Sequence, residues 1–408
     1  MRNHYKIKFL DIALFFLAIS TCLWSTTWHF LDLIKSSILF YLSLIFTSLI
    51  IIINYFNFSS IKNKVFIYLF LFFFINLFYF LVGLSEYIIK NHNTSYIIEY
   101  FIKQNISILF ALLFYNYIFF EENIDKFIKY IIYTYIIIFS VLIYIYIFLY
   151  NSSFVGVIID FDYGPTRANK NTLGIFICLL FPFILSYILK KKSFVVGIIF
   201  LVLYFIVAVK IDSTTIKLLL ILQLLLYFFI HFKKSLLVLS FLSLTIFSIY
   251  SIFAKQSENI FFQQLMFGKE VDEINTFLEF ETHRGNLFYS GIQKIKKDLF
   301  LGDGVETFRI REDNQGSLTE THNAYINLAV SYGIFGLFVY LSFYIFIIFK
   351  LYKKNNLIIS NYDSSCIVYI ISLLFVLNSI NMEYNSAVWL LNSICLARAF
   401  AGEKNITK

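Results

Sequence analysis

Long runs of apolar residues recur along most of this 408-residue chain, and they restrict its fold more than any other feature. About 20 apolar residues in an α-helix span the hydrocarbon core of a membrane. The runs are continuously apolar, whereas the strands of a membrane β-barrel alternate between apolar and polar residues. Because only helices and closed barrels pair every backbone polar group inside lipid, the runs predict an all-α protein.

The predicted architecture is a polytopic integral membrane bundle of about twelve transmembrane helices with one long periplasmic loop. The composition agrees, because 60% of the residues are hydrophobic and 14% are charged, against about 45–50% and about 25% in soluble domains. The first run follows basic residues without a small-residue cleavage site, which favours a retained signal anchor. The spans are expected near residues 9–27, 37–53, 64–85, 106–121, 127–150, 172–189, 194–209, 216–232, 235–254, 324–349, 364–381 and 384–400.

The lysine and arginine residues predict the orientation of this bundle. The formal net charge is +8, and in a membrane protein basic residues in short loops mark the cytoplasmic side, so no nucleic-acid partner is expected. With about twelve spans, all the basic clusters fall on one side, and both termini are expected on the cytoplasmic side of the inner, or only, membrane. The clusters are Arg2/Lys6/Lys8, Lys62/Lys64, Lys126/Lys129, Lys190/Lys191/Lys192, Lys233/Lys234 and Lys350/Lys353/Lys354.

The connections on the opposite, outer side are the expected place for chemistry. The predicted division is a membrane bundle at 1–254, a periplasmic loop or cap at 255–323, and three last spans with a cytoplasmic tail at 324–408. A loop of this length is usually functional or disordered. The apolar pattern from Leu287 to Leu299 favours a small helical cap within it. The shorter outer connections are 86–105, 151–171 and 210–215.

Two of the shorter connections carry positive charge close to helix ends. Arg167 and Lys170 follow a Gly-Pro turn and precede the span that begins near Thr172, where backbone N–H groups attract anions. Lys210 interrupts two apolar spans, at a depth where ionisable groups usually face a cavity. A phosphate-binding lip and an ordinary solvated turn with a helix cap both fit the first segment. Snorkelling of a lysine at a hairpin also explains Lys210.

An arginine and two glycines occupy the later part of the long loop. Arg284 stays charged at any relevant pH, and its guanidinium pairs with phosphate oxygens in a bidentate way. Gly302-Asp303-Gly304 follows, and glycines permit close approach of backbone to a ligand. Asp303 stands between the two glycines, and a loop carboxylate is usually only solvated.

The end of the long loop provides a candidate base. Glu320, His322 and Asn323 precede an apolar span that contains Gly333 and Gly336. The unperturbed pKa of histidine is about 6.5, so it can accept a proton near neutral pH. A single interfacial histidine is more often a cap or a hydrogen-bonded surface residue, but this one shares the predicted outer face with two arginine segments.

The run His322-Asn323, nine residues, Gly333-Ile334-Phe335-Gly336 resembles the H-[NSQ]-x9-G-x-x-G signature of the O-antigen ligases, the lipid A-core:surface polymer ligases of Gram-negative envelopes. That family has a similar number of transmembrane helices and a long periplasmic loop between two late spans, with an arginine before a Gly-x-Gly segment. Arg284, Gly302/Gly304 and His322 match this order. The segment from Arg167 is similar to an earlier periplasmic segment of the family, so the resemblance covers residues 150–345.

The chain departs from the family pattern at two places. Leu337-Phe338 stand where family ligases commonly have a Thr-Thr pair, and Ser213-Thr214-Thr215 replace a Ser/Thr-Arg motif. Lys210 or Lys217 could supply the missing charge, but a lysine does not reproduce the guanidinium fork. The superfamily also contains O-antigen polymerases and protein O-oligosaccharyltransferases, so ligase and polymerase remain alternatives.

The resemblance implies an inverting glycosyltransferase that moves a glycan from undecaprenyl diphosphate to lipid A-core or to a growing glycan, without a metal or cofactor. His322 would be the general base on the acceptor hydroxyl. Basic groups would stabilise the charge that develops on the diphosphate, and Gly333 and Gly336 would be structural. The implied donor- or sugar-binding residues are Arg284, Arg167, Lys170, Lys210, Asn323 and Glu320.

A transporter or flippase of lipid-linked sugars is the alternative from another class. Such proteins usually have Gly/Pro-broken spans in corresponding halves and ionisable groups at the membrane midplane. Here Pro182 is the only proline within a predicted span, and the polar residues crowd the outer face. A purely structural scaffold would not explain the charged loop with its histidine.

Overall fold

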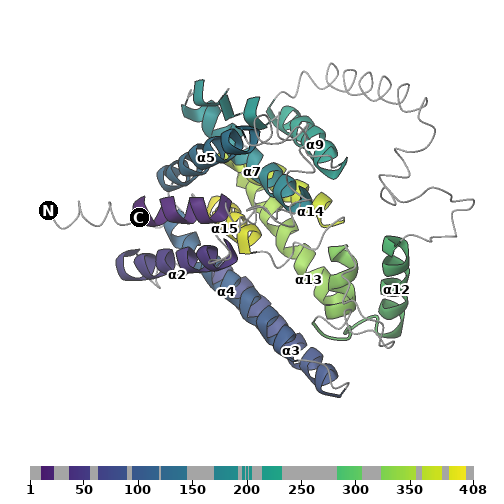
Figure 1. Cartoon of the computed structure of the whole chain (residues 1–408). Helices are drawn as coiled ribbons and strands as arrows, with labels where there is room; N and C mark the ends of the chain where they lie inside the picture. Colours follow the sequence, from purple (N-terminus) through teal and green to yellow (C-terminus); the bar gives the residue numbers. More distant parts are fainter. Residues whose placement is uncertain are drawn as a thin grey trace, which may run out of the picture.

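The computed structural model of the chain describes residues 11–22, 36–55, 63–89, 94–118, 121–144, 170–191, 195–197, 199–200, 202–204, 214–231, 283–305, 323–354, 361–378 and 386–400. Every regular element in these ranges is a helix, which confirms the predicted all-α class (Figure 1). A further helix covers Asp11–Cys22. The labelled helices are α2 (Ser36–Tyr55), α3 (Asn63–Ile89), α4 (Ser95–Ile118), α5 (Glu121–Tyr144), α7 (Lys170–Lys191), α9 (Thr214–His231), α12 (His283–Lys297), α13 (Ala324–Lys354), α14 (Asn361–Val376) and α15 (Ser386–Phe400).

Two of the described helices are long and apolar enough to cross a membrane. They contain the stretches Phe70–Ile89 of α3 and Ala324–Lys353 of α13. In the other apolar helices, the apolar stretches identified among the described residues are 10–17 residues long, fewer than the roughly 20 that a span requires. The described residues therefore agree with membrane association, and they do not establish the predicted number of twelve spans.

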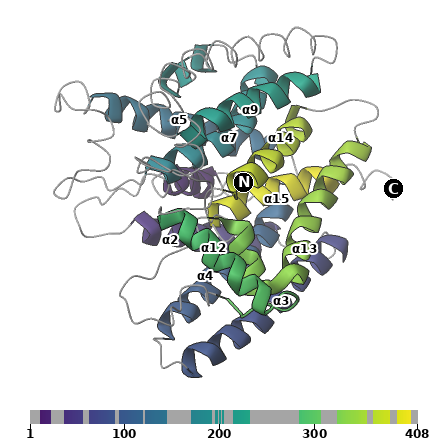
Figure 2. The ribbon, with the colours of Figure 1, turned by 90° about the vertical axis from the view of Figure 1, so that its right-hand side faces the viewer.

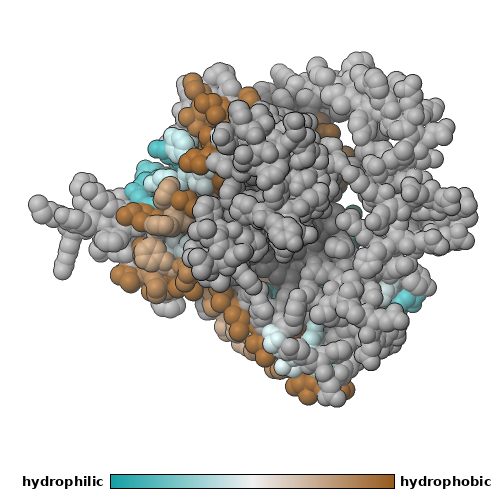
Figure 3. All heavy atoms as spheres, in the orientation of Figure 1, coloured by the Kyte–Doolittle hydropathy of each residue, from teal (hydrophilic) through white to brown (hydrophobic). Residues whose placement is uncertain are grey.

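Large apolar side chains cover the outer surfaces of α2 and α3 (Figure 3). Phe70, Phe74 and Phe78 follow one another at one-turn spacing along α3, and each is about half exposed. Contiguous exposed patches of this kind are rare on soluble monomers and mark contact with a partner or with lipid. This surface agrees with membrane association of the chain. The exposed apolar residues of α2 are Leu42, Ile45, Phe46, Leu49, Ile52 and Ile53.

Aromatic rings join helices from distant parts of the sequence in the middle of the bundle. Trp389 of α15 meets Phe72 of α3 edge to face, with ring centroids 5.7 Å apart, and its centroid lies 6.0 Å from that of Phe343 in α13. Edge-to-face pairs contribute about 0.5–1.5 kcal/mol beyond the burial of their area. One cluster thus fixes three helices to one another, and all three rings are buried.

The predicted outer connection at 86–105 is wrong in its extent. Helix α3 continues to Ile89 and α4 begins at Ser95, so most of the predicted connection is helical. Glu86 and Glu99 lie within these helices. Charged residues near the end of an apolar helix do not terminate it, because a long side chain can carry its charge to the interface while the backbone stays helical.

Hydrogen-bonded charges join α5, α7 and α14 at one end of the bundle. The carboxylate of Asp125 accepts a hydrogen bond from the hydroxyl of Tyr362 at 2.6 Å, and the Nζ atom of Lys190 lies 3.4 Å from the same carboxylate. The Nζ atom of Lys190 also lies over the Tyr362 ring, 5.1 Å from its centroid. The start of α5, the end of α7 and the start of α14 therefore meet, and we call this the basic end.

A buried ion pair adds α15 to the basic end. The Nε atom of Arg398 donates to Oδ1 of Asp363 at 2.7 Å, and these side chains are only 6% and 2% exposed. Lys350, near the end of α13, lies over the ring of Phe400 at 5.6 Å. Helices α5 and α14 thus begin at the basic end, and α7, α13 and α15 end there. This is the alternation of direction that the predicted spans require for these five helices.

Helix α13 is broken at Gly333, and a loop of the chain fills the break. Gly333 has φ 63° and ψ −177°, a conformation that only glycine adopts readily. The N–H groups of Asp303 and Gly304 donate to the carbonyls of Val330 and Ser331 at 2.8 Å and 3.1 Å, and the N–H of Ile334 donates to the carbonyl of Leu299 at 2.9 Å. The loop therefore pairs backbone groups that the break leaves without helical partners. We call residues 298–305 and 330–334 together the corner.

Glycines allow the two backbones of the corner to touch. A Cβ atom on Gly302 would lie 2.7 Å from the carbonyl oxygen of Val330, and one on Gly333 would overlap the carbonyl of Phe300. A Cβ atom on Gly304 would lie 2.7 Å from the Cα atom of Gly83, so the loop also rests directly on α3. The sequence suggested that Gly302 and Gly304 let the backbone approach a ligand; the close approach observed at these glycines is to the chain's own backbone.

Replacing Gly333 by alanine should destabilise the protein by at least about 1–3 kcal/mol, because the required backbone conformation is strained for any residue with a Cβ atom. The measurement is the thermal unfolding of the detergent-purified variant beside the wild type. Ile334→Ala is the matched control, since the adjacent Ile334 side chain is 44% exposed and its removal leaves the corner intact. Equal melting temperatures for Gly333→Ala and wild type would contradict this role.

Candidate functional site

The structure describes the predicted site residues to different extents. Asn323, Gly333 and Gly336 are described with their surroundings. The backbone of Arg284 lies in the first turn of α12, and Lys170 is the first residue of α7. The positions of Arg167, Lys210, Glu320 and His322 are outside the described residues.

Four helices that border the predicted outer segments begin at the end of the bundle opposite the basic end. Helix α7 ends at the basic end, so Lys170 opens it at the other end. Helix α9 runs beside α7 in the same direction, because Gln223 donates to the carbonyl of Cys178 at 2.7 Å and Tyr227 contacts Ser186 at 3.4 Å. Helix α9, which begins at Thr214 shortly after Lys210, therefore starts at this end too. We call the end of the bundle opposite the basic end the site end.

Helices α12 and α13 also begin together at the site end. Ile292 and Ile295 of α12 pack on Ile326 and Val330 of α13, and just after the end of α12 the carbonyl of Leu299 accepts the hydrogen bond from the N–H of Ile334. The second half of α12 therefore packs on the first turns of α13, and the two helices run in the same direction (Figure 1, Figure 2). This arrangement brings the first turn of α12, which contains Arg284, to the same end as Asn323.

Asn323 caps the start of α13. Its Oδ1 atom accepts hydrogen bonds from the backbone N–H groups of Tyr325 and Ile326 at 3.0 Å and 3.2 Å. This is the usual way in which an N-cap side chain pairs two of the free donors of a first helical turn. The Nδ2 atom of Asn323 donates to Oδ1 of Asn378 at 2.9 Å. Asn323 is thus a buried structural anchor, whereas the sequence resemblance implied a donor- or sugar-binding role.

The end of α14 holds the start of α13 in place. The N–H of Ala324 donates to the carbonyl of Leu377 at 2.8 Å, and the hydroxyl of Tyr325 donates to the carbonyl of Leu374. The last carbonyls of a helix lack partners within it, so each contact pairs free groups of both helices. The start of α13, immediately after His322, is therefore fixed by five hydrogen bonds within α13 and to the end of α14.

The site end has an electrostatic preference for anions. The N-terminus of a helix carries the equivalent of about half a positive charge, and its free N–H groups point outward. Helices α7, α9 and α12 present their N-termini here, and Lys170 and Arg284 lie in the first turns of two of them. Helix α13 adds its dipole but not free N–H groups, because its first N–H groups are bonded to Asn323 and Leu377. The same end therefore combines aligned helix dipoles with basic residues.

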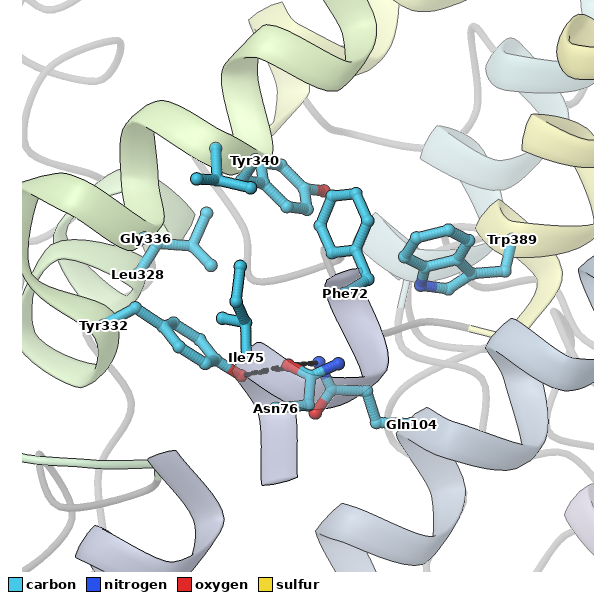
Figure 4. A pocket seen from close by; sticks show the side chains of 10 residues that line it. Phe72, Ile75, Asn76, Gln104, Leu328, Tyr332, Gly336, Tyr340 and Trp389 are labelled. Carbon is cyan, nitrogen blue, oxygen red and sulfur yellow. Dashed lines mark hydrogen bonds between the residues drawn. The ribbon is translucent and has the colours of Figure 1, made fainter. Parts of the chain in front are cut away.

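Gly336 accommodates a neighbouring tyrosine. A Cβ atom on Gly336 would overlap the Cβ atom of Tyr332, one turn earlier in α13. Tyr332 and Gly336 then line a pocket together with residues of α3, α4 and α15 (Figure 4). The two glycines of the H-N-x9-G-x-x-G run consequently have separate structural functions, because Gly333 admits the loop and Gly336 makes room for Tyr332.

Sequence reasoning missed Asn378 as a member of the site end. Asn378 lies just beyond α14, in a short polar interruption between two apolar runs, and it is exposed beside Asn323. Its position in the predicted span 364–381 concealed it. No group of three His, Cys, Asp or Glu residues within the described part of the chain is placed to hold a metal ion.

No protein-family model matches this chain, and no curated protein matches its sequence. The resemblance to the O-antigen ligases consequently depends on the short motifs themselves. The geometry of the site end is the additional argument for a function.

Asn323→Ala should lower stability by about 1 kcal/mol, because the variant loses the acceptor that caps α13. Asn323→Ser should retain most of that stability, since a serine hydroxyl can accept the same backbone hydrogen bonds. Asn378→Ala is the control that removes only the side-chain pair between the two asparagines. Chemical denaturation monitored by circular dichroism would measure all three variants, and a fully stable Asn323→Ala would rule out the cap.

Proposed function

We propose that the chain is an O-antigen ligase, a glycosyltransferase that moves a glycan from undecaprenyl diphosphate to lipid A-core at the periplasmic face of the bacterial inner membrane. The observation that carries the proposal is the convergence of the motif segments at one end of the bundle. Helices α7 and α12 carry Lys170 and Arg284 in their first turns, and α13 begins two residues after His322. These three helix starts lie at the site end, although more than 150 residues separate Lys170 from His322. A chance motif match would not require this convergence.

The electrostatics of the site end suit a diphosphate donor. Arg284 and Arg167 would bind the diphosphate, with Lys170 or Lys210 as additional cations, because guanidinium groups pair with phosphate oxygens at two points. The helix N-termini supply further N–H donors. These groups stabilise the negative charge that develops on the leaving diphosphate in the transition state. The apolar surfaces of the helices provide a medium for the polyprenyl tail of the donor.

The reaction needs one base and a good leaving group. His322 accepts the proton of an acceptor sugar hydroxyl while that oxygen forms a bond to the anomeric carbon of the donor. The bond from this carbon to the diphosphate oxygen breaks, and undecaprenyl diphosphate leaves with the electron pair. Attack from the face opposite the leaving group inverts the anomeric centre. Glu320 and Asp303 are candidates for orienting His322 or the sugar.

An O-antigen polymerase, which joins repeat units on undecaprenyl diphosphate, is the second candidate. The absence of the Thr-Thr pair favours it, yet Leu337 packs on the core and Phe338 is 68% exposed on the outer surface of α13. Positions 337 and 338 therefore lie away from the site end, and their change removes no group from it. A transporter of lipid-linked sugars is a weaker candidate, because the charged residues occupy helix ends.

His322→Ala should abolish glycan transfer while leaving expression and membrane insertion unchanged, since only the proton acceptor is lost. The assay is restoration of core-linked glycan in a strain that lacks the gene. His283→Ala is the matched control, because this histidine begins α12 and has no assigned chemical role. Near-normal transfer by His322→Ala would refute the base assignment.

Arg284→Lys should strongly reduce the rate of glycan transfer although it keeps the positive charge. The reason is that an ammonium group cannot make the bidentate contact with a phosphate. Initial rates with a polyprenyl-diphosphate glycan donor would measure the loss. The control is Lys296→Arg, because Lys296 lies at the exposed end of α12. Arg398→Lys would be unsuitable, because Arg398 forms a buried ion pair with Asp363 at the basic end. Equal rates for Arg284→Lys and wild type would reduce Arg284 to an electrostatic role.

The proposed topology places the site end in the periplasm and the basic end in the cytoplasm. Cysteines introduced at Gly316 and Lys192 should therefore differ in their reaction with a membrane-impermeant maleimide added to intact cells. Gly316→Cys should be labelled and Lys192→Cys should not. The four native cysteines are all buried, so background labelling should be low. The opposite labelling pattern would overturn the orientation and the location of the site.

A further inference from the structure

Three polar side chains from three helices meet in the apolar middle of the bundle. The Nε2 atom of Gln104 in α4 donates to Oδ1 of Asn76 in α3 at 2.8 Å, and the hydroxyl of Tyr332 in α13 donates to the same oxygen at 3.0 Å. Each of the three residues is only 3% exposed. We call this group the polar node. The polar node is connected to the corner, because Tyr332 belongs to both and immediately precedes Gly333.

The polar node leaves one donor and one acceptor of the two amides unused. Among the described residues, Nδ2 of Asn76 and Oε1 of Gln104 have no hydrogen-bond partner. Exchanging the nitrogen and oxygen of either amide does not remove the deficit, because each amide still uses only one of its two ends. A buried polar atom without a partner is costly, and such atoms in native proteins usually bond to an ordered water.

Asn76 and Gln104 both line a small pocket. The pocket is bounded by the polar node and by apolar side chains, among them Phe72, Leu328 and Trp389 (Figure 4). It leaves about 20 Å³ for the centre of a water-sized molecule, and about 10–15 Å³ is sufficient for one water. A water molecule offers both a donor and an acceptor, and it fits this space.

We propose that the pocket binds a single structural water molecule between Asn76 and Gln104. The water accepts a hydrogen bond from Nδ2 of Asn76 and donates one to Oε1 of Gln104. It thereby completes the hydrogen bonding of a node that links α3, α4 and α13 beside the break at Gly333. Its effect is to hold Tyr332, and with it the corner on which α12 rests. This inference is independent of the transferase reaction.

Millisecond X-ray footprinting of the purified full chain in water enriched in oxygen-18 tests the proposal. Radicals formed from a bound water add labelled oxygen to the side chain beside it, even where bulk solvent has no access. Tyr332 should be labelled at least about tenfold faster than Tyr369, because the first lies at the water site and the second is fully buried with its hydroxyl bonded to Val388 and Asn392. Equal rates for the two tyrosines would overturn the proposal.

Paired substitutions test whether the two amides hold the water. Asn76→Leu/Gln104→Leu keeps similar volume and removes both partners, so labelling of Tyr332 should fall to the rate of Tyr369. Gln223→Leu is the matched control, because Gln223 is an equally buried amide in α9, and this variant should label Tyr332 at the wild-type rate. Unchanged labelling of Tyr332 in the double variant would contradict the assignment. If that variant does not fold, the comparison of the two tyrosines in the wild type still decides.

Discussion

The break in α13 at Gly333 is the feature on which the arrangement of the site end depends. An uninterrupted helix would bond the N–H of Ile334 and the carbonyls of Val330 and Ser331 internally, and the break releases these groups. The loop that follows α12 pairs with them, so α12 is held against the first turns of α13. The start of α13 is in turn tied to the end of α14 through Asn323. Three segments are thus oriented by one local departure from helical geometry.

The two ends of the bundle are stabilised by different physical means. At the basic end, charges are paired in partly or fully buried positions, as in the contact between Asp363 and Arg398. Such pairs are costly to break because the remaining charge is left without a partner. At the site end, the described contacts are mainly backbone hydrogen bonds and neutral amides. Its cationic side chains consequently need no internal carboxylate in the proposed function, and a phosphorylated donor supplies the negative charge.

Hydropathy correctly predicted that the described elements are helices, because a helix in lipid depends on local apolar runs. The pattern from Leu287 to Leu299 likewise predicted a helix, observed as His283–Lys297. The functions of the glycines could not be deduced in this way, since the partner of Gly302 is Gly333, far along the chain. The cap by Asn323 and the polar node were missed for the same reason. Local sequence gives no register between distant segments, and that register determines which polar groups meet.

The most direct test of the proposed function is the distribution of envelope glycan in a strain from which the gene has been deleted. Gel analysis would compare glycan chains on lipid A-core with chains on undecaprenyl diphosphate. A ligase predicts that the core carries no chains while full-length chains accumulate on the lipid carrier. Core-linked chains of normal length and amount would contradict the account. Core that carries a single repeat unit would instead identify the protein as the polymerase.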